Sequence, residues 1–252
     1  MPIVYPFANS DALSGGLNSF VEKASGEAIA DHGYFSVAIS GGSLPKILSK
    51  ELAFNKNVDF SKWHVFWADE RCVAHDSADS NYLEVKKSLF DHIPHIPQEN
   101  IYPINEKYAI AKDAESAATD YEEQLKKFFK NELPQFDIIL LGMGPDGHCC
   151  SLFPGHPLLD ESKRWVAPIV DSPKPPPERI TLTYPVVNNS KLVVFVTAGD
   201  GKKDMVQQII EQPEKNLPCQ RVKPTQGGKV YWFIDEAAAS KLRKESCSEY
   251  KL

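Results

Sequence analysis

The sequence predicts an α/β protein with a doubly wound, mostly parallel sheet flanked by helices. Short apolar runs rich in β-branched residues alternate with stretches of helical periodicity, which is typical of parallel strands joined by crossing helices. Several of these runs end at glycine, where a buried strand turns into the next helix. The 252 residues contain no internal repeat, so we expect a single domain over residues 1–252.

The first part of the chain predicts a glycine loop between a strand and a helix. Helical spacing over residues 9–30 is followed by a β-branched run at residues 35–39. That run leads into Ser40-Gly41-Gly42-Ser43, and Pro45 marks the first turn of a helix that reaches residue 52. Such a loop surrounds an anion with backbone N–H groups at the positive end of a helix. A tight turn that only requires glycine remains the alternative.

The next predicted strand, residues 63–68, ends in three charged side chains. Asp69, Glu70 and Arg71 follow it directly, and charges at the tip of an apolar strand are costly unless they are paired or used. A salt-bridged structural cluster remains open for Asp69 and Glu70. Arg71 is a candidate ligand for phosphate or carboxylate, because guanidinium binds both in a bidentate fork. Helices are expected at residues 83–89 and 109–130.

The stretch FDIILLGMGPDGHCCSLFPGHP carries the main candidate for catalysis. Its apolar run, residues 138–141, predicts a buried strand that ends at a glycine turn with Asp146 and His148. Catalytic side chains in open α/β sheets lie at such carboxyl ends, and histidine titrates nearest neutral pH. An acid–base pair is therefore predicted here, with a solvated glycine turn as the alternative.

The same turn spells the dinucleotide pattern Gly142-x-Gly144-x-x-Gly147, yet we expect no cofactor. That pattern requires a helix at its end and an acidic residue about twenty positions later, after a second strand. Pro145 and the sequence Ser-Leu-Phe-Pro-Gly interrupt any such helix. Cys149-Cys150 lack a second cysteine pair at zinc spacing, so no metal is expected either and these cysteines are interpreted as packing residues.

The last part of the chain supplies two more cations. A strand at residues 165–169 precedes the proline-rich residues 173–177, interpreted as a stiff surface connection, which lead to Arg179 and a strand at residues 180–184. A strand at residues 192–197 then ends in a second glycine loop that carries Lys202. The remaining elements expected are a helix near residues 205–210, a strand at 230–234 and a helix at 237–243.

Composition limits the partners. A formal net charge of −6 argues against general binding to nucleic acid or to an anionic membrane. No run is long enough to span a membrane, and the odd count of five cysteines fits a reducing compartment. We therefore expect a cytoplasmic protein that is a monomer or a weak homodimer. A cationic pocket in an acidic protein favours a small anion such as a phosphorylated metabolite.

The motifs together resemble those of the 6-phosphogluconolactonases, which share a wider group with glucosamine-6-phosphate deaminases. The resemblance covers nearly the whole chain and implies a Rossmann-like fold of the NagB/RpiA type. It rests on the following segments: Ser40-Gly41-Gly42-Ser43, Asp69-Glu70-Arg71, Ser80-Asn81-Tyr82, residues 142–148, residues 151–155, residues 175–183 and residues 199–202.

The resemblance implies that 6-phospho-D-glucono-1,5-lactone is hydrolysed to 6-phospho-D-gluconate, a step of the pentose phosphate pathway. His148 would activate water with Asp146 as its partner, and Asp69 would give polar support. The implied phosphate-binding residues are Ser40, Gly41, Gly42, Ser43, Arg71, Arg179 and Lys202. Two departures are Leu44, where many members have threonine, and Cys149-Cys150, where Thr-Ala is common.

Two other functions remain open. A deaminase or sugar-phosphate isomerase would use Asp69 as a proton shuttle, but Phe153 stands where the deaminases carry a glutamate. A non-catalytic paralogue would keep the sheet as a binding module. The second is opposed by four intact residues, Asp146, His148, Arg71 and Lys202.

Overall fold

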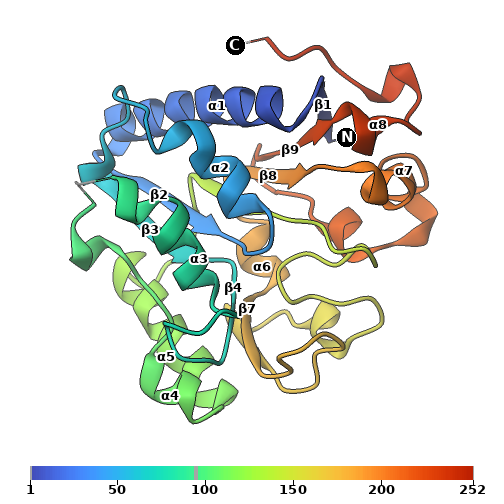
Figure 1. Cartoon of the computed structure of the whole chain (residues 1–252). Helices are drawn as coiled ribbons and strands as arrows, with labels where there is room; N and C mark the ends of the chain where they lie inside the picture. The colour runs from blue at the N-terminus through green and yellow to red at the C-terminus, as the bar shows by residue number, and fades with distance from the viewer. Residues whose placement is uncertain (1, 94–95, 252) are drawn as a thin grey trace.

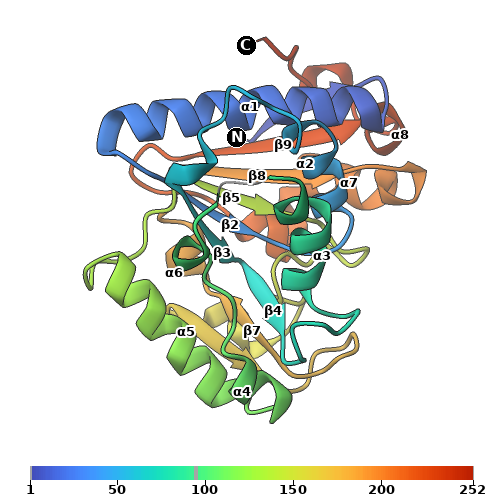
Figure 2. The ribbon, with the colours of Figure 1, turned by 60° about the vertical axis from the view of Figure 1, so that its left-hand side comes forward.

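The computed structural model of the protein describes residues 2–93 and 96–251. Six parallel strands form its main sheet. Their order is β1-β9-β8-β5-β2-β3. Figure 1 shows this sheet in the upper half of the molecule, and in Figure 2 strands β9, β8, β5, β2 and β3 follow one another from top to bottom. The strands are β1 (Ile3–Phe7), β2 (Phe35–Ile39), β3 (Trp63–Trp67), β5 (Ile138–Leu141), β8 (Leu192–Thr197) and β9 (Lys229–Asp235).

A second, antiparallel sheet lies below the first in Figure 1 and has the order β4-β7-β6. Its strands are β4 (Asp69–Arg71), β6 (Val166–Ile169) and β7 (Arg179–Leu182). Only Ala68 separates β3 from β4, so the chain passes straight from one sheet into the other. The charged triplet expected at the end of a strand is therefore a strand of its own.

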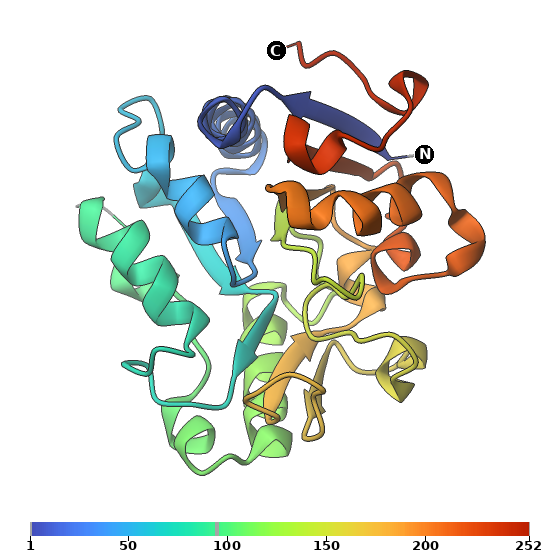
Figure 3. The same cartoon turned by 45° about the vertical axis from the view of Figure 1, so that its right-hand side comes forward.

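Helices cover both faces of the parallel sheet, as the alternating side chains of its strands require. In β2, Val37 and Ile39 belong to a core shared with Leu13 and Leu17 of α1, whereas Ala38 faces the opposite core. Figure 3 shows α1, α2 and α3 on one side of the sheet and α7 on the other. The helices are α1 (Ser10–His32), α2 (Leu44–Leu52), α3 (Asn81–Ser88), α4 (Glu106–Ile110), α5 (Ala114–Phe128), α6 (Tyr184–Val187), α7 (Lys203–Glu211) and α8 (Glu236–Ala239).

The predicted fold class is confirmed, and the differences lie in particular segments. The single helix expected over residues 109–130 is wrong, because Lys112 has a positive φ of 55° and Asp113 caps a new helix through Ser116. Strand β1, which contains Pro6, was not predicted. The strand expected at residues 180–184 instead ends at Leu182, where Thr183 precedes the short helix α6.

Candidate active site

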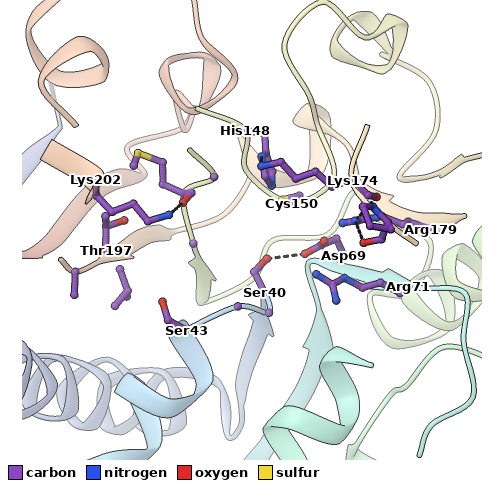
Figure 4. A pocket seen from close by; sticks show the side chains of 18 residues that line it. Ser40, Ser43, Asp69, Arg71, His148, Cys150, Lys174, Arg179, Thr197 and Lys202 are labelled. Carbon is purple, nitrogen blue, oxygen red and sulfur yellow. Dashed lines mark hydrogen bonds between the residues drawn. The ribbon is translucent and has the colours of Figure 1, made fainter. Parts of the chain in front are cut away.

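A cavity of about 300 Å³ is lined by loops at the carboxyl ends of β8, β5, β2 and β3, which are consecutive in the sheet. Open α/β sheets bind ligands at the carboxyl ends of strands where the strand order reverses, and here the order reverses between β2 and β5. Figure 4 shows the side chains that line the cavity. Those predicted from the sequence are Ser40, Gly41, Gly42, Ser43, Asp69, Arg71, His148, Arg179 and Lys202.

Asp146 does not line this cavity but is paired with His148, which does. The loop after β5 folds back on itself, because the Gly144 N–H donates to the His148 carbonyl at 2.9 Å and the Gly147 N–H to the Gly144 carbonyl at 3.0 Å. A Cβ at Gly144 would lie 2.0 Å from His148 Nδ1. Glycine is therefore required at this position to let the imidazole and the carboxylate meet.

His148 Nδ1 lies 2.5 Å from Asp146 Oδ1. Burial favours the neutral carboxyl, but the hydrogen bond from His148 and the charges of His148 and Lys174 outweigh it and lower the pKa of Asp146. An ionised carboxylate accepts a hydrogen bond from Nδ1–H, and in this tautomer of the neutral imidazole the lone pair is on Nε2. Nε2 has no hydrogen-bond partner in the described part of the chain. This is the arrangement of a general base.

Phe153 packs against this imidazole, with ring centroids 4.5 Å apart, and is buried. Its ring also faces the Arg179 guanidinium at 5.7 Å. The position at which the resemblance places a glutamate in deaminases is therefore occupied here by a packing residue that holds His148.

Asp69 orients the hydroxyl groups of two serines, and it lines the cavity together with one of them, Ser40. Its Oδ1 accepts from Ser40 Oγ at 2.6 Å and its Oδ2 from Ser151 Oγ at 2.9 Å. Asn81 Nδ2 donates to the backbone carbonyl of Asp69 at 2.9 Å. The side-chain oxygen of Asn81, Oδ1, lies so close to Gly41 that a Cβ there would be 1.9 Å from it. The serine–glycine loop is thus set against Asp69 and Asn81.

Glu70 is fully buried and belongs to the protein's architecture. Its carboxylate accepts hydrogen bonds from the backbone N–H groups of Arg71 at 2.7 Å, Asn81 at 2.9 Å and Tyr82 at 2.8 Å. The last two of these residues lie at the start of α3. Burial raises its pKa to about 7 against the opposing effect of these N–H groups. The salt-bridged cluster considered for Asp69 and Glu70 is wrong, because the partners found for both carboxylates are hydroxyl and backbone N–H groups.

The three predicted cations lie at two sides of the cavity. Figure 4 shows Lys202 beside Thr197 on one side and Arg71 and Arg179 on the other. Lys202 Nζ donates to the Met143 carbonyl at 2.9 Å. Burial, and then the charge of Lys174, lower the pKa of Lys202. Arg71, Arg179 and Lys202 therefore share one cavity without meeting at one point.

The Arg179 guanidinium donates most of its hydrogen bonds to backbone carbonyls of the proline-rich loop. Its Nε donates to the Pro176 carbonyl at 2.9 Å, and its Nη2 to the carbonyls of Lys174 at 2.8 Å and Pro175 at 3.2 Å. Nη1 approaches Ser151 Oγ at 3.4 Å. The buried guanidinium thus fixes the course of the proline-rich loop.

This loop places in the cavity a residue that sequence reasoning missed. Residues 173–177 were interpreted as a surface connection, but Lys174 and Pro175 line the cavity. Lys174 Nζ lies 3.3 Å from Asp146 Oδ1 and 3.4 Å from His148 Nδ1. The only sequence signal was a lysine close to Arg179 at the entry to a strand.

Two further observations concern the described residues, 2–93 and 96–251. Among them, no three His, Cys, Asp or Glu side chains come together as a set that could hold a metal ion. None of their helices combines the length and the apolar character needed to cross a membrane. Cys149 and Cys150 are both buried, as their interpretation as packing residues requires, although Cys150 also contributes to the cavity wall.

Comparison with known proteins identifies the family. The family model described as glucosamine-6-phosphate isomerases/6-phosphogluconolactonase matches residues 8–232. The chain belongs to this family. A Schizosaccharomyces pombe protein named "Probable 6-phosphogluconolactonase" is 43% identical over 249 residues, which cover 96% of this chain and 97% of that protein. "Probable 6-phosphogluconolactonase 2" of Oryza sativa subsp. indica is 42% identical over 257 residues, or 95% of this chain and 90% of that one.

Solved structures of the family share the fold. The crystal structure of 6-phosphogluconolactonase from Leishmania guyanensis superimposes with a TM-score of 0.83 at 28% identity, covering 96% of this chain and 99% of that one. The family membership and the NagB/RpiA-type fold implied by the sequence motifs are therefore both confirmed.

Proposed function

We propose that this chain hydrolyses 6-phospho-D-glucono-1,5-lactone to 6-phospho-D-gluconate in the pentose phosphate pathway. The observation that carries the proposal is the pairing of His148 Nδ1 with Asp146 at 2.5 Å. It leaves Nε2 without a partner among the described residues, and His148 lines a cavity that also contains Arg71, Arg179 and Lys202. The names of the relatives support the same reaction.

The proposed reaction uses water as the nucleophile and His148 as the base. Nε2 takes a proton from water while the water oxygen bonds to the lactone carbonyl carbon. When the tetrahedral intermediate collapses, the bond to the ring oxygen breaks and the same proton passes from Nε2 to that oxygen. Asp146 stabilises the imidazolium between the two steps and keeps the ring oriented.

The rest of the cavity would hold the substrate by its phosphate and hydroxyl groups. The serine–glycine loop opens α2 and offers backbone N–H groups and the Ser43 hydroxyl, while Lys202 and Arg71 supply positive charge from the two sides. Binding the remote phosphate orients the lactone, so binding energy is converted into reaction rate. Arg179 contributes through the loop that it holds.

Hydrolysis fits these residues better than deamination or isomerisation. A proton shuttle would need a free carboxylate beside the sugar, but both oxygens of Asp69 accept hydroxyl hydrogen bonds. Phe153 packs on His148 and cannot transfer protons. A purely binding paralogue would have no need of the close Asp146–His148 pair.

The test is hydrolysis of freshly prepared lactone, measured as acid release above the spontaneous rate. Glucosamine-6-phosphate serves as the parallel substrate. We expect rapid lactone opening and no ammonia release. Ammonia release without lactone opening would establish the deaminase instead, and inactivity on both substrates would favour the binding module.

We also propose that the protein is a cytoplasmic monomer or weak homodimer. The cysteines identified as free, Cys72, Cys149, Cys150, Cys219 and Cys247, suit a reducing compartment. Within the described ranges, large exposed apolar side chains come from four separate segments, at Phe54, Ile110, Leu133 and Val170. An obligate interface would need a contiguous apolar patch. Sedimentation at several concentrations would reveal a stable oligomer.

A further inference from the structure

We propose that Lys174 is a catalytic residue whose ammonium group stabilises the oxyanion formed on the lactone carbonyl oxygen. This inference rests on the proposed lactone hydrolysis and adds the group that the base alone does not supply. A general base generates the nucleophile, but the negative charge on the carbonyl oxygen requires a separate donor.

Lys174 lies beside the Asp146–His148 pair. Its Nζ lies 3.4 Å from His148 Nδ1 and 3.3 Å from Asp146 Oδ1, and Lys174 lines the cavity. Its side chain keeps 35% of its surface exposed, so the ammonium is not sealed off from a ligand. An ammonium carries three N–H donors. Asp146 takes one of them and leaves the others for an oxygen atom of the substrate.

The other cations of the cavity are worse placed for this task. Arg179 directs Nε and Nη2 to three loop carbonyls. Lys202 donates to the Met143 carbonyl and lies on the side of the cavity away from Lys174. Arg71 directs Nη1 to the Asp79 carbonyl at 2.7 Å, and Figure 4 shows it below Asp69, away from His148. Lys174 is the cation that contacts the catalytic pair directly.

The backbone of Lys174 is held by hydrogen bonds to Arg179 and Ser172. Its carbonyl accepts from Arg179 Nη2 and from Ser172 Oγ, both at 2.8 Å, and its N–H donates to Ser172 Oγ at 3.3 Å. Arg179 and Ser172 are themselves buried. The backbone bonds fix the start of the side chain, and Asp146 Oδ1 holds Nζ at its end. A donor positioned in this way stabilises developing charge with little reorganisation at the moment of reaction. The buried arginine therefore serves the reaction by fixing the lysine.

The added interaction fits the proton balance of the proposed reaction. As water bonds to the carbonyl carbon, its proton moves to His148 Nε2 and the carbonyl π electrons move to the oxygen. That oxygen accepts a hydrogen bond from Lys174, which stays protonated throughout. When the carbonyl reforms, the ring carbon–oxygen bond breaks and the ring oxygen takes the proton from His148.

The test compares Lys174→Met with Lys174→Arg and with the control Lys163→Met, whose exposed side chain lies outside the cavity. Lactone hydrolysis is measured over the spontaneous rate, binding of 6-phosphogluconate is measured by calorimetry, and melting temperatures check the fold. We expect Lys174→Met to lower kcat by about 10²–10³-fold, the loss usual for one oxyanion donor. KM and product binding should change little, Lys174→Arg should recover part of kcat, and Lys163→Met should match wild type.

Three results would overturn the assignment. They are an unchanged kcat in Lys174→Met, a raised KM with unchanged kcat, and a loss of product binding together with kcat, because the proposal assigns Lys174 to the transition state alone. An active wild-type enzyme with any of these results removes the role of Lys174 and leaves the lactonase intact. An inactive wild-type enzyme removes both.

Discussion

Replacing Arg179 with methionine should weaken the fold and the reaction together. The guanidinium makes three hydrogen bonds to the carbonyls of residues 174–176 at 2.8–3.2 Å and is buried. A hydrogen bond to a charged group contributes about 1.5–3 kcal/mol. Because the three bonds are not additive and the carbonyls can find water, we expect a loss on the order of 3–5 kcal/mol. For a protein of this size that corresponds to a fall in Tm of about 6–20 °C.

Thermal unfolding followed by circular dichroism measures this loss, with Arg71→Met as the matched control. One hydrogen bond of the Arg71 side chain was found, from Nη1 to the Asp79 carbonyl at 2.7 Å, so the control should lose less stability. In kinetics, Arg179→Met should lower kcat because Lys174 loses its support. It should also raise KM, because Pro175 on the same loop lines the cavity and loses its hydrogen bond from Arg179. A melting temperature within about 2 °C of wild type, or no lower than that of Arg71→Met, would refute the structural role of Arg179.

Three further substitutions test Asp146 and Lys202 in the site and Glu70 in the structure beside it. Asp146→Asn should lower kcat by about 10²–10⁴-fold, since the amide no longer fixes the Nδ1 proton; unchanged turnover would exclude the pair. The pKa of Asp146 is lower in the folded protein than in the unfolded chain, so the ionised carboxylate stabilises the fold above the unfolded-state pKa. This stabilisation is lost as the pH falls through the folded-state pKa. The difference in unfolding free energy between wild type and Asp146→Asn should therefore shrink below about pH 4. Lys202→Ala should raise KM by the equivalent of about 1–3 kcal/mol, and an equal KM would remove it from the phosphate site. Glu70→Gln should lower the free energy of unfolding in urea by about 1–3 kcal/mol, because the glutamine NH2 group would face the backbone N–H of Tyr82 or Asn81 in place of an acceptor. An equally stable variant would contradict this role of Glu70.

The alternation of strands and helices was predictable because each element carries its own local pattern. Residues 138–141 and 192–197 are buried on both faces and read as continuous apolar runs. Strand β1 carries Pro6 and lies at the sheet edge, so its pattern was weaker. The break before α5 depends on Lys112 adopting a positive φ, for which the lysine side chain gives no local signal.

In the candidate site, too, residues with a local sequence pattern were predictable and residues placed by distant contacts were not. Glycine loops at strand ends revealed Ser40, His148 and Lys202, because each directly follows a recognisable strand or loop. Lys174 could not be found in this manner, since its place depends on buried hydrogen bonds from Arg179, a residue in the adjacent strand. The partners of Asp69 were equally out of reach, because Ser151 lies 82 positions away in the sequence.

The proposed reaction requires an imidazole that acts on an ester while other residues hold the phosphate. Hydrolysis of fresh 6-phosphogluconolactone by wild type and His148→Ala, with 6-phosphogluconate binding measured on both, tests this directly. We predict rapid wild-type hydrolysis, a kcat lowered about 10²–10⁴-fold in the variant and product binding that survives. Wild-type turnover in His148→Ala would contradict the account.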